Sequence, residues 1–173
     1  VMNENCPAYV KKETVTPQKA AEIIRQANGK VILAHPVAYE HEEGLNEEES
    51  LFAKIIRDAD KIDIFYEGVT MFWNGKEELV EGSLISPEVF KQIENKTQVK
   101  REVRQTPIDD VLSVLGFIFD INFFKSFEIL KQEDYVNKML NRYKMKDLES
   151  EKELEEIKSI ANKYIEQRIE ESE

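Results

Sequence analysis

Three aspartates interrupt an otherwise apolar stretch of the sequence, LFAKIIRDADKIDIF. Asp58, Asp60 and Asp63 lie close enough to occupy neighbouring turns of one helix. Clustered carboxylates provide the oxygen ligands that divalent cations prefer, and they also form ion pairs with Lys or Arg. Arg57 and Lys61 lie among them. The stretch therefore predicts either part of a metal site or a set of structural ion pairs.

A helical wheel assigns different surroundings to the three aspartates. The apolar residues fall in one arc when about 100° separates consecutive residues, which predicts a buried stripe. This stripe comprises Phe52, Ile55, Ile56, Ala59, Ile62 and Tyr66. Asp63 lies about 50° from the centre of the arc and is expected to point into the core, where a carboxylate needs a donor, a cation or a metal. Asp58 and Asp60 lie about 95° and 105° away on opposite flanks, which predicts boundary positions.

Other residues suited to chemistry are few. The chain has two histidines, His35 and His41, and one cysteine, Cys6. A single cysteine excludes an internal disulfide and favours a reducing, cytoplasmic compartment. His41 lies among acidic residues in a polar segment, where a solvated side chain and a substitute metal ligand are the two alternatives.

The charge of the chain restricts its partners. A net charge of -11 disfavours duplex DNA and anionic membranes, and no apolar run reaches the length of about 20 residues that a membrane helix needs. Lys100, Arg101 and Arg104 form a local basic cluster. Such a cluster could receive the phosphate of a small phosphorylated substrate or nucleotide. The alternative is that this cluster belongs to an exposed surface of mixed charge. The sequence also leaves open whether the chain forms a homo-oligomer.

Capping signals place the aspartates on a helix. Thr16 and Pro17 begin an amphipathic segment that Asn28 and a glycine end, and the short apolar run VILA follows as a strand. Asn46 and Glu49 then show the capping-box spacing directly before the stretch that carries the aspartates. The N-terminal part therefore predicts a helix followed by a strand, and the aspartates lie on a later helix.

The remaining signals are helical. Thr106 and Asp109 repeat the capping chemistry before the most apolar segment of the chain, and the tail from Asp147 carries one apolar stripe. We predict a mainly α fold with two parts. A short helix-strand segment occupies residues 1–45, and a helical domain occupies residues 46–173.

The aspartate stretch resembles the last motif of the HD superfamily of metal-dependent phosphohydrolases, a helical segment of the form (A/D)AD(K/R)(L/I). The resemblance continues through SLISPEVF and TPIDDVLSVLGFIFDINFF and covers residues 46–173. It implies an HD-like helical domain in which Asp60 is a catalytic metal ligand and Lys61 is a partner of phosphate or a carboxylate. Asp58 and Asp63 would orient the site from its flanks. The implied cofactor is divalent Mn, Mg or Fe, which activates a water for attack on a phosphate ester.

Residues 8–40 resemble a different family. AYVKKETVTPQKAAEIIRQANGKVILAHPVAY is similar to a late segment of the PHP family, metal-dependent phosphoesterases built on a distorted (β/α) barrel. There the histidine of LAHP is a metal ligand at the end of a strand, which corresponds to His35. This resemblance implies a fragment of a PHP-type phosphoesterase.

Each resemblance lacks most of the corresponding metal site. An HD enzyme needs a His-Asp dipeptide, whereas Pro36 and Glu42 follow the two histidines of this chain. A PHP enzyme needs His-x-His and Asp-x-His, and the sequence contains neither. The leading hypothesis is therefore an incomplete HD-like phosphohydrolase module, weakly active or inactive alone. A PHP fragment and a non-catalytic helical interaction domain are the alternatives. The start at Val1 instead of methionine suggests a piece of a longer protein.

Overall fold

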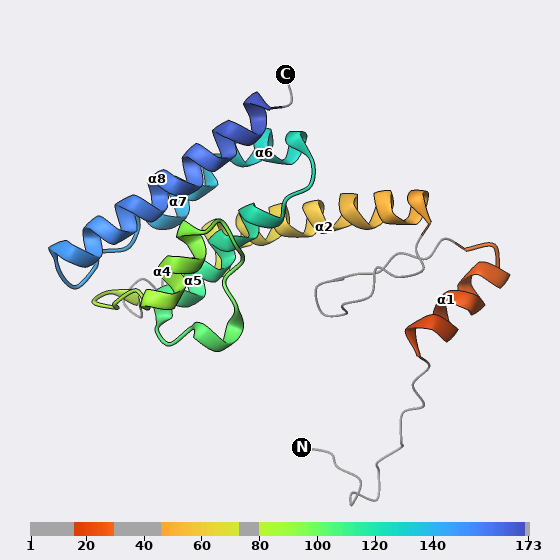
Figure 1. The fold of residues 1–173 in the computed structure, drawn as a ribbon, viewed down its shortest axis with the longest axis horizontal. Helices are drawn as coiled ribbons and strands as arrows, with labels where there is room; N and C mark the ends of the chain where they lie inside the picture. Colours follow the sequence, from red (N-terminus) through yellow and green to blue (C-terminus); the bar gives the residue numbers. More distant parts are fainter. Residues whose placement is uncertain (1–15, 30–45, 73–79, 172–173) are drawn as a thin grey trace, which may run out of the picture. The chain divides into compact units, whose positions relative to one another are not determined.

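The computed structural model describes residues 16–29, 46–72 and 80–171. Every regular element in these ranges is a helix, which confirms the predicted mainly α fold (Figure 1). The chain forms two compact units, residues 1–53 and 54–173, and the division lies within one long helix. The predicted VILA strand lies outside the described residues.

The first unit contains α1 (Pro17–Gln26), and both of its ends match the sequence prediction. The Thr16 hydroxyl accepts a hydrogen bond from the Lys19 amide at 3.2 Å, which satisfies one of the free amides of the first turn. Asn28 has a φ of 57°, the left-handed conformation that closes many helices.

The long helix α2 (Glu47–Glu67) begins with a complete capping box. The Asn46 side chain accepts from the Glu49 amide at 2.9 Å, and the Glu49 carboxylate accepts from the Asn46 amide at 3.1 Å. Arg25 donates to the same carboxylate, with Nη2 2.9 Å from Oε2, and its hydrogen bond lowers the pKa of Glu49. A π-helical turn, Gly68–Phe72, follows α2 directly.

The described part of the second unit adds five further α-helices to α2. They are α4 (Pro87–Glu94), α5 (Pro107–Leu115), α6 (Phe124–Gln132), α7 (Tyr135–Leu140) and α8 (Leu148–Glu170). Two 3-10 segments, Arg101–Val103 and Gly116–Asp120, connect α4 to α5 and α5 to α6. The last helix, α8, packs along α6, α7 and α4, so the C-terminal tail closes the bundle (Figure 1).

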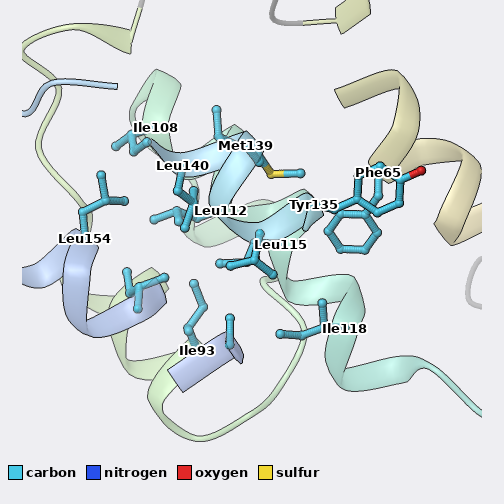
Figure 2. Packing of buried hydrophobic residues seen from close by; sticks show 14 of the residues in the cluster. Phe65, Ile93, Ile108, Leu112, Leu115, Ile118, Tyr135, Met139, Leu140 and Leu154 are labelled. Carbon is cyan, nitrogen blue, oxygen red and sulfur yellow. The ribbon is translucent and has the colours of Figure 1, made fainter. Parts of the chain in front are cut away.

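One hydrophobic core joins the helices of this unit. Leu112 of α5 lies in its centre near Met139 and Leu140 of α7, and all three side chains are fully buried (Figure 2). Phe65 connects α2 to the same core, because its ring stacks on Tyr135 with 6.2 Å between centroids. Removing this apolar surface from water is the dominant stabilising contribution to the unit.

The starts of α4 and α5 share one buried carboxylate. Asp109, fully buried, accepts hydrogen bonds from the Ser86 amide at 3.0 Å and from the Ser86 hydroxyl at 2.6 Å. It also accepts from the amides of Gln105 at 2.8 Å and Thr106 at 3.1 Å, which completes the predicted capping box of α5. A single side chain therefore fixes the first turns of two helices against each other.

The turn after α5 depends on a glycine. A Cβ at Gly116 would lie 3.1 Å from the backbone nitrogen of Val99. The two segments therefore approach closely because Gly116 has no side chain.

The final helix follows the predicted apolar pattern along its buried face, and a local side chain caps its first turn. The Asp147 carboxylate accepts from the Ser150 amide at 2.9 Å and caps α8. The buried apolar side chains of the predicted stripe are Leu154, Ile157, Ala161 and Ile165, with Tyr164 and Ile169 partly buried. The tail therefore docks its apolar face on the core, as its periodicity predicts.

We predict that Leu112→Ala lowers the free energy of unfolding by about 2–5 kcal/mol, because it leaves a cavity in the packed core. The matched control is Leu148→Ala, since Leu148 is 81% exposed, and its effect should stay within about 0.5 kcal/mol. Urea unfolding followed by far-ultraviolet circular dichroism measures both. Equal losses for the two variants would contradict the assigned core.

The cap of α8 should respond to acid. The hydrogen bond from Ser150 lowers the pKa of Asp147 below its usual 3.8. A carboxyl with a lowered folded pKa stabilises the fold above about pH 3.8, and this contribution is lost as the pH falls through the folded value. Thermal unfolding midpoints of the chain and of Asp147→Asn should therefore converge on acidification, since Asn does not titrate. A difference between the two midpoints that stays constant down to about pH 2 would contradict a stabilising role for the Asp147 carboxylate.

Candidate functional site

Helix α2 turns Asp58 and Lys61 inward and most of its apolar stripe outward. Asp58 is 2% exposed and Lys61 6% exposed, on the face where Phe65 enters the core. On the other face Ile55 is 46% exposed and Tyr66 51% exposed. The predicted burial of the apolar stripe is therefore wrong for most of its length. The tertiary partners of Asp58 and Lys61 explain the reversal, because a helical wheel takes no account of distant hydrogen-bond donors.

Asp58 holds the start of α6 from a distance of more than sixty residues in sequence. Its Oδ1 accepts from the amide of Asn122 at 2.9 Å and from the Asn122 side-chain amide at 2.8 Å. Its Oδ2 accepts from the Phe123 amide at 2.9 Å and from the Ser126 hydroxyl at 2.8 Å. These donors lie where a helix begins and leaves amides unpaired, and a negative charge is favoured there. Asp58 thus caps α6 in place of a local side chain.

Lys61 and Arg57 hold the residue that precedes this cap. The Lys61 ammonium donates to both the backbone carbonyl and the carboxylate of Asp120. Arg57 donates to the same carboxylate, with Nη2 2.8 Å from Oδ2. Burial lowers the pKa of Lys61, and the hydrogen bond and charge of Asp120 partly oppose that shift.

We call this set the polar clamp. It consists of Arg57, Asp58 and Lys61 on α2 with Asp120, Asn122, Phe123 and Ser126 on the segment that enters α6. Both oxygens of Asp58 are occupied by protein donors, and Lys61 is engaged by Asp120. The chemistry of the clamp is therefore the compensation of buried charge by opposite charge and hydrogen bonds.

The structure separates the four predicted site residues of α2. Asp58 and Lys61 lie together on the buried face, so the predicted boundary position of Asp58 is wrong. Asp60 is half-buried, at the edge between the two faces, as the wheel predicts. Asp63 is exposed, and its predicted burial in the core is wrong because the face that carries it is the outer one.

The predicted basic cluster is partly engaged within the fold. Arg104 donates to the Ser113 hydroxyl at 3.1 Å and forms an ion pair with Asp110 at 3.2 Å. Lys100 and Arg101 are exposed. Their predicted role in binding phosphate stays a prediction.

Only one of the two predicted metal ligands lies among the described residues. Asp60 is described, whereas His35 lies outside the described residues. Across residues 16–29, 46–72 and 80–171, no three His, Cys, Asp or Glu side chains lie in a group suited to a metal ion. The pairing of His35 with Asp60 stays a prediction.

Sequence reasoning missed Asp120, Asn122 and Ser126 as partners of the aspartate stretch. One signal was present in the sequence. Two phenylalanines, Phe123 and Phe124, stand at the start of α6, where Ser, Thr, Asp or Asn is usual at the N-cap. A helix start without a capping side chain requires a cap from another segment or from water.

No family model, no curated protein and no solved structure matches this chain. Within the part of the chain that the structure describes, none of the helices has the length and apolarity required to span a bilayer. The chemistry of α2 and of the segments that it contacts is therefore what indicates function.

We predict that Asp58→Ala strongly destabilises the second unit. An unsatisfied buried donor costs about 1–3 kcal/mol, and two backbone amides lose their acceptor, so the total should be on the order of 3 kcal/mol. Asp63→Ala is the matched control on the same helix, with an expected change within about 0.5 kcal/mol. Urea unfolding measures both. A larger loss of stability for Asp63→Ala than for Asp58→Ala would instead support the helical-wheel prediction that Asp63 is the buried carboxylate.

Proposed function

We propose that the helical part of this chain is a binding module of HD-like design that does not hydrolyse phosphate esters by itself. The orientation of α2 carries this proposal. Its motif residues Asp58 and Lys61 are buried in the polar clamp, while its apolar stripe faces solvent. A buried, fully hydrogen-bonded carboxylate stabilises a scaffold, and an exposed apolar stripe favours contact with another macromolecule.

The engagement of Asp58 and Lys61 argues against catalysis by this segment alone. Metal-dependent hydrolysis requires ligands that leave a coordination position for water or substrate, and the resemblance assigns supporting roles to Asp58 and Lys61. Lys61 is held by Asp120, and Asp58 takes its hydrogen bonds from the start of α6. Neither side chain can turn toward a substrate without breaking the clamp.

An HD-like phosphohydrolase is the second candidate, and the position of Asp60 favours it. Asp60 lies at the edge of α2, where a carboxylate can reach a metal without being buried. Under this hypothesis Asp60 and His35 bind Mn, Mg or Fe. Lys100 and Arg101 bind the phosphate of a small phosphorylated substrate or nucleotide. The same ligand, His35, would serve the PHP-type alternative. A cytoplasmic location accords with the single cysteine, Cys6, in either case.

A hydrolysis assay with the full chain separates the two candidates. The chain, dialysed and then supplied with Mn²⁺, should give no turnover of p-nitrophenyl phosphate above Mn²⁺ alone, and metal analysis after dialysis should find less than one equivalent. Asp60→Ala and His35→Ala should leave both results unchanged, with Asp63→Ala as the control. Turnover at ordinary rates, about 1–1000 per second, that Asp60→Ala abolishes would overturn the proposal.

A further inference from the structure

The outward face of α2 has the form of a helix-docking surface. We define the exposed α2 stripe as Ile55, Ile56, Ala59, Asp63 and Tyr66, all of which are exposed. Monomeric proteins seldom leave a row of large apolar side chains on one helix face without a partner.

The spacing of the stripe fits a second helix. Ile55, Ala59, Ile62 and Tyr66 follow one another at intervals of four, three and four residues. This is the spacing of a helix-helix seam, in which side chains insert between those of the facing helix. Ile62 is partly buried against the core, so it connects the seam to the folded unit and holds it in place.

The charged side chains beside this surface are carboxylates, because helix geometry places Arg57 and Lys61 on the opposite side of α2. Arg57 and Lys61 are turned to the opposite face, where Asp120 binds both. Asp63 is exposed beside the seam, and Glu67 is half-buried one turn further along. The flank of the seam thus carries carboxylates, and Asp120 binds Arg57 and Lys61 on the other side of the helix.

This charge pattern disfavours a second copy of the chain as the partner. A two-fold dimer places the same surface patch on both sides of its interface. Two copies of the exposed α2 stripe would supply carboxylates to the flanks but no bases to meet them. Charges that flank a helix-helix seam determine which partners associate, and like charges oppose association.

We propose that the exposed α2 stripe binds an amphipathic helix of a partner protein that carries Lys or Arg beside its apolar face. The apolar side chains of that helix would pack between Ile55 and Tyr66, and its bases would meet Asp63 and Glu67. The inference rests on the proposed binding function and adds the chemistry of the partner to it.

Two designed helical peptides test the proposal. They share one apolar seam and differ only in having Lys or Glu at every flanking position. In fluorescence anisotropy at low salt, the full chain should bind the Lys peptide at least about tenfold more tightly than the Glu peptide. Asp63→Lys should weaken binding of the Lys peptide about fivefold or more, and Ile55→Glu should abolish it.

Matched controls lie on the exposed surface of α8. Glu170→Lys makes the same charge change as Asp63→Lys, and Leu148→Glu makes a similar change to Ile55→Glu. Both should leave peptide binding unchanged. Circular dichroism and urea unfolding of each variant show whether the fold is retained, because the stripe variants alter exposed side chains only.

Several outcomes would overturn the proposal. Equal binding of the two peptides, no binding of either, or binding that Asp63→Lys leaves intact would each do so. A concentration-dependent dimer dissolved by Ile55→Glu would assign the stripe to a second copy. A Tyr66 ring unreactive to hydroxyl radicals in the monomeric chain would assign it to another segment of this chain. Phosphatase turnover in the same preparation would instead overturn the proposed function, whatever the peptides do.

Discussion

The buried carboxylate of Asp58 is the constraint on which the arrangement of the second unit depends. A carboxylate removed from water must be compensated, and the start of α6 supplies backbone and side-chain donors that do so. This requirement fixes the rotation of α2 about its axis. With Asp58 and Lys61 facing inward, Phe65 enters the core, and Ile55 is left 46% exposed. The exposed apolar stripe is thus a consequence of the clamp.

Two buried carboxylates, Asp58 and Asp109, each cap the start of a helix, one across a long sequence separation and one within its own helix. Asp109 caps its own helix three residues from Thr106 and also binds Ser86, whereas Asp58 caps a helix that lies far along the chain. In both cases one side chain satisfies the free amides of a helix start and joins two segments. The difference in sequence separation decides what can be predicted. The Thr106–Asp109 cap is visible as a local pattern, but the partners of Asp58 are visible only in three dimensions.

The polar clamp also changes how the aspartate motif is interpreted. The resemblance to the HD superfamily implies that Asp60 is a metal ligand and that Asp58 and Lys61 assist it. In this chain, Asp58 and Lys61 bind donors and acceptors of their own fold. A motif identifies residue types and spacing, while chemistry depends on what each side chain faces. An aspartate that accepts from several amides contributes stability, and a surface left apolar by that arrangement is suited to binding.

The sequence by itself determined where the helices with local caps begin. The predicted caps at Thr16, Asn46 and Thr106 are all observed, because capping acts over a few neighbouring residues. It also determined the buried stripe of α8, where apolar periodicity and tertiary packing agree. Only the tertiary structure decided which face of α2 is buried. Periodicity predicts that the most apolar face of a helix is buried. In α2 the hydrogen bonds of Asp58 and Lys61 with a distant segment outweigh that preference, so the face that carries them is buried instead.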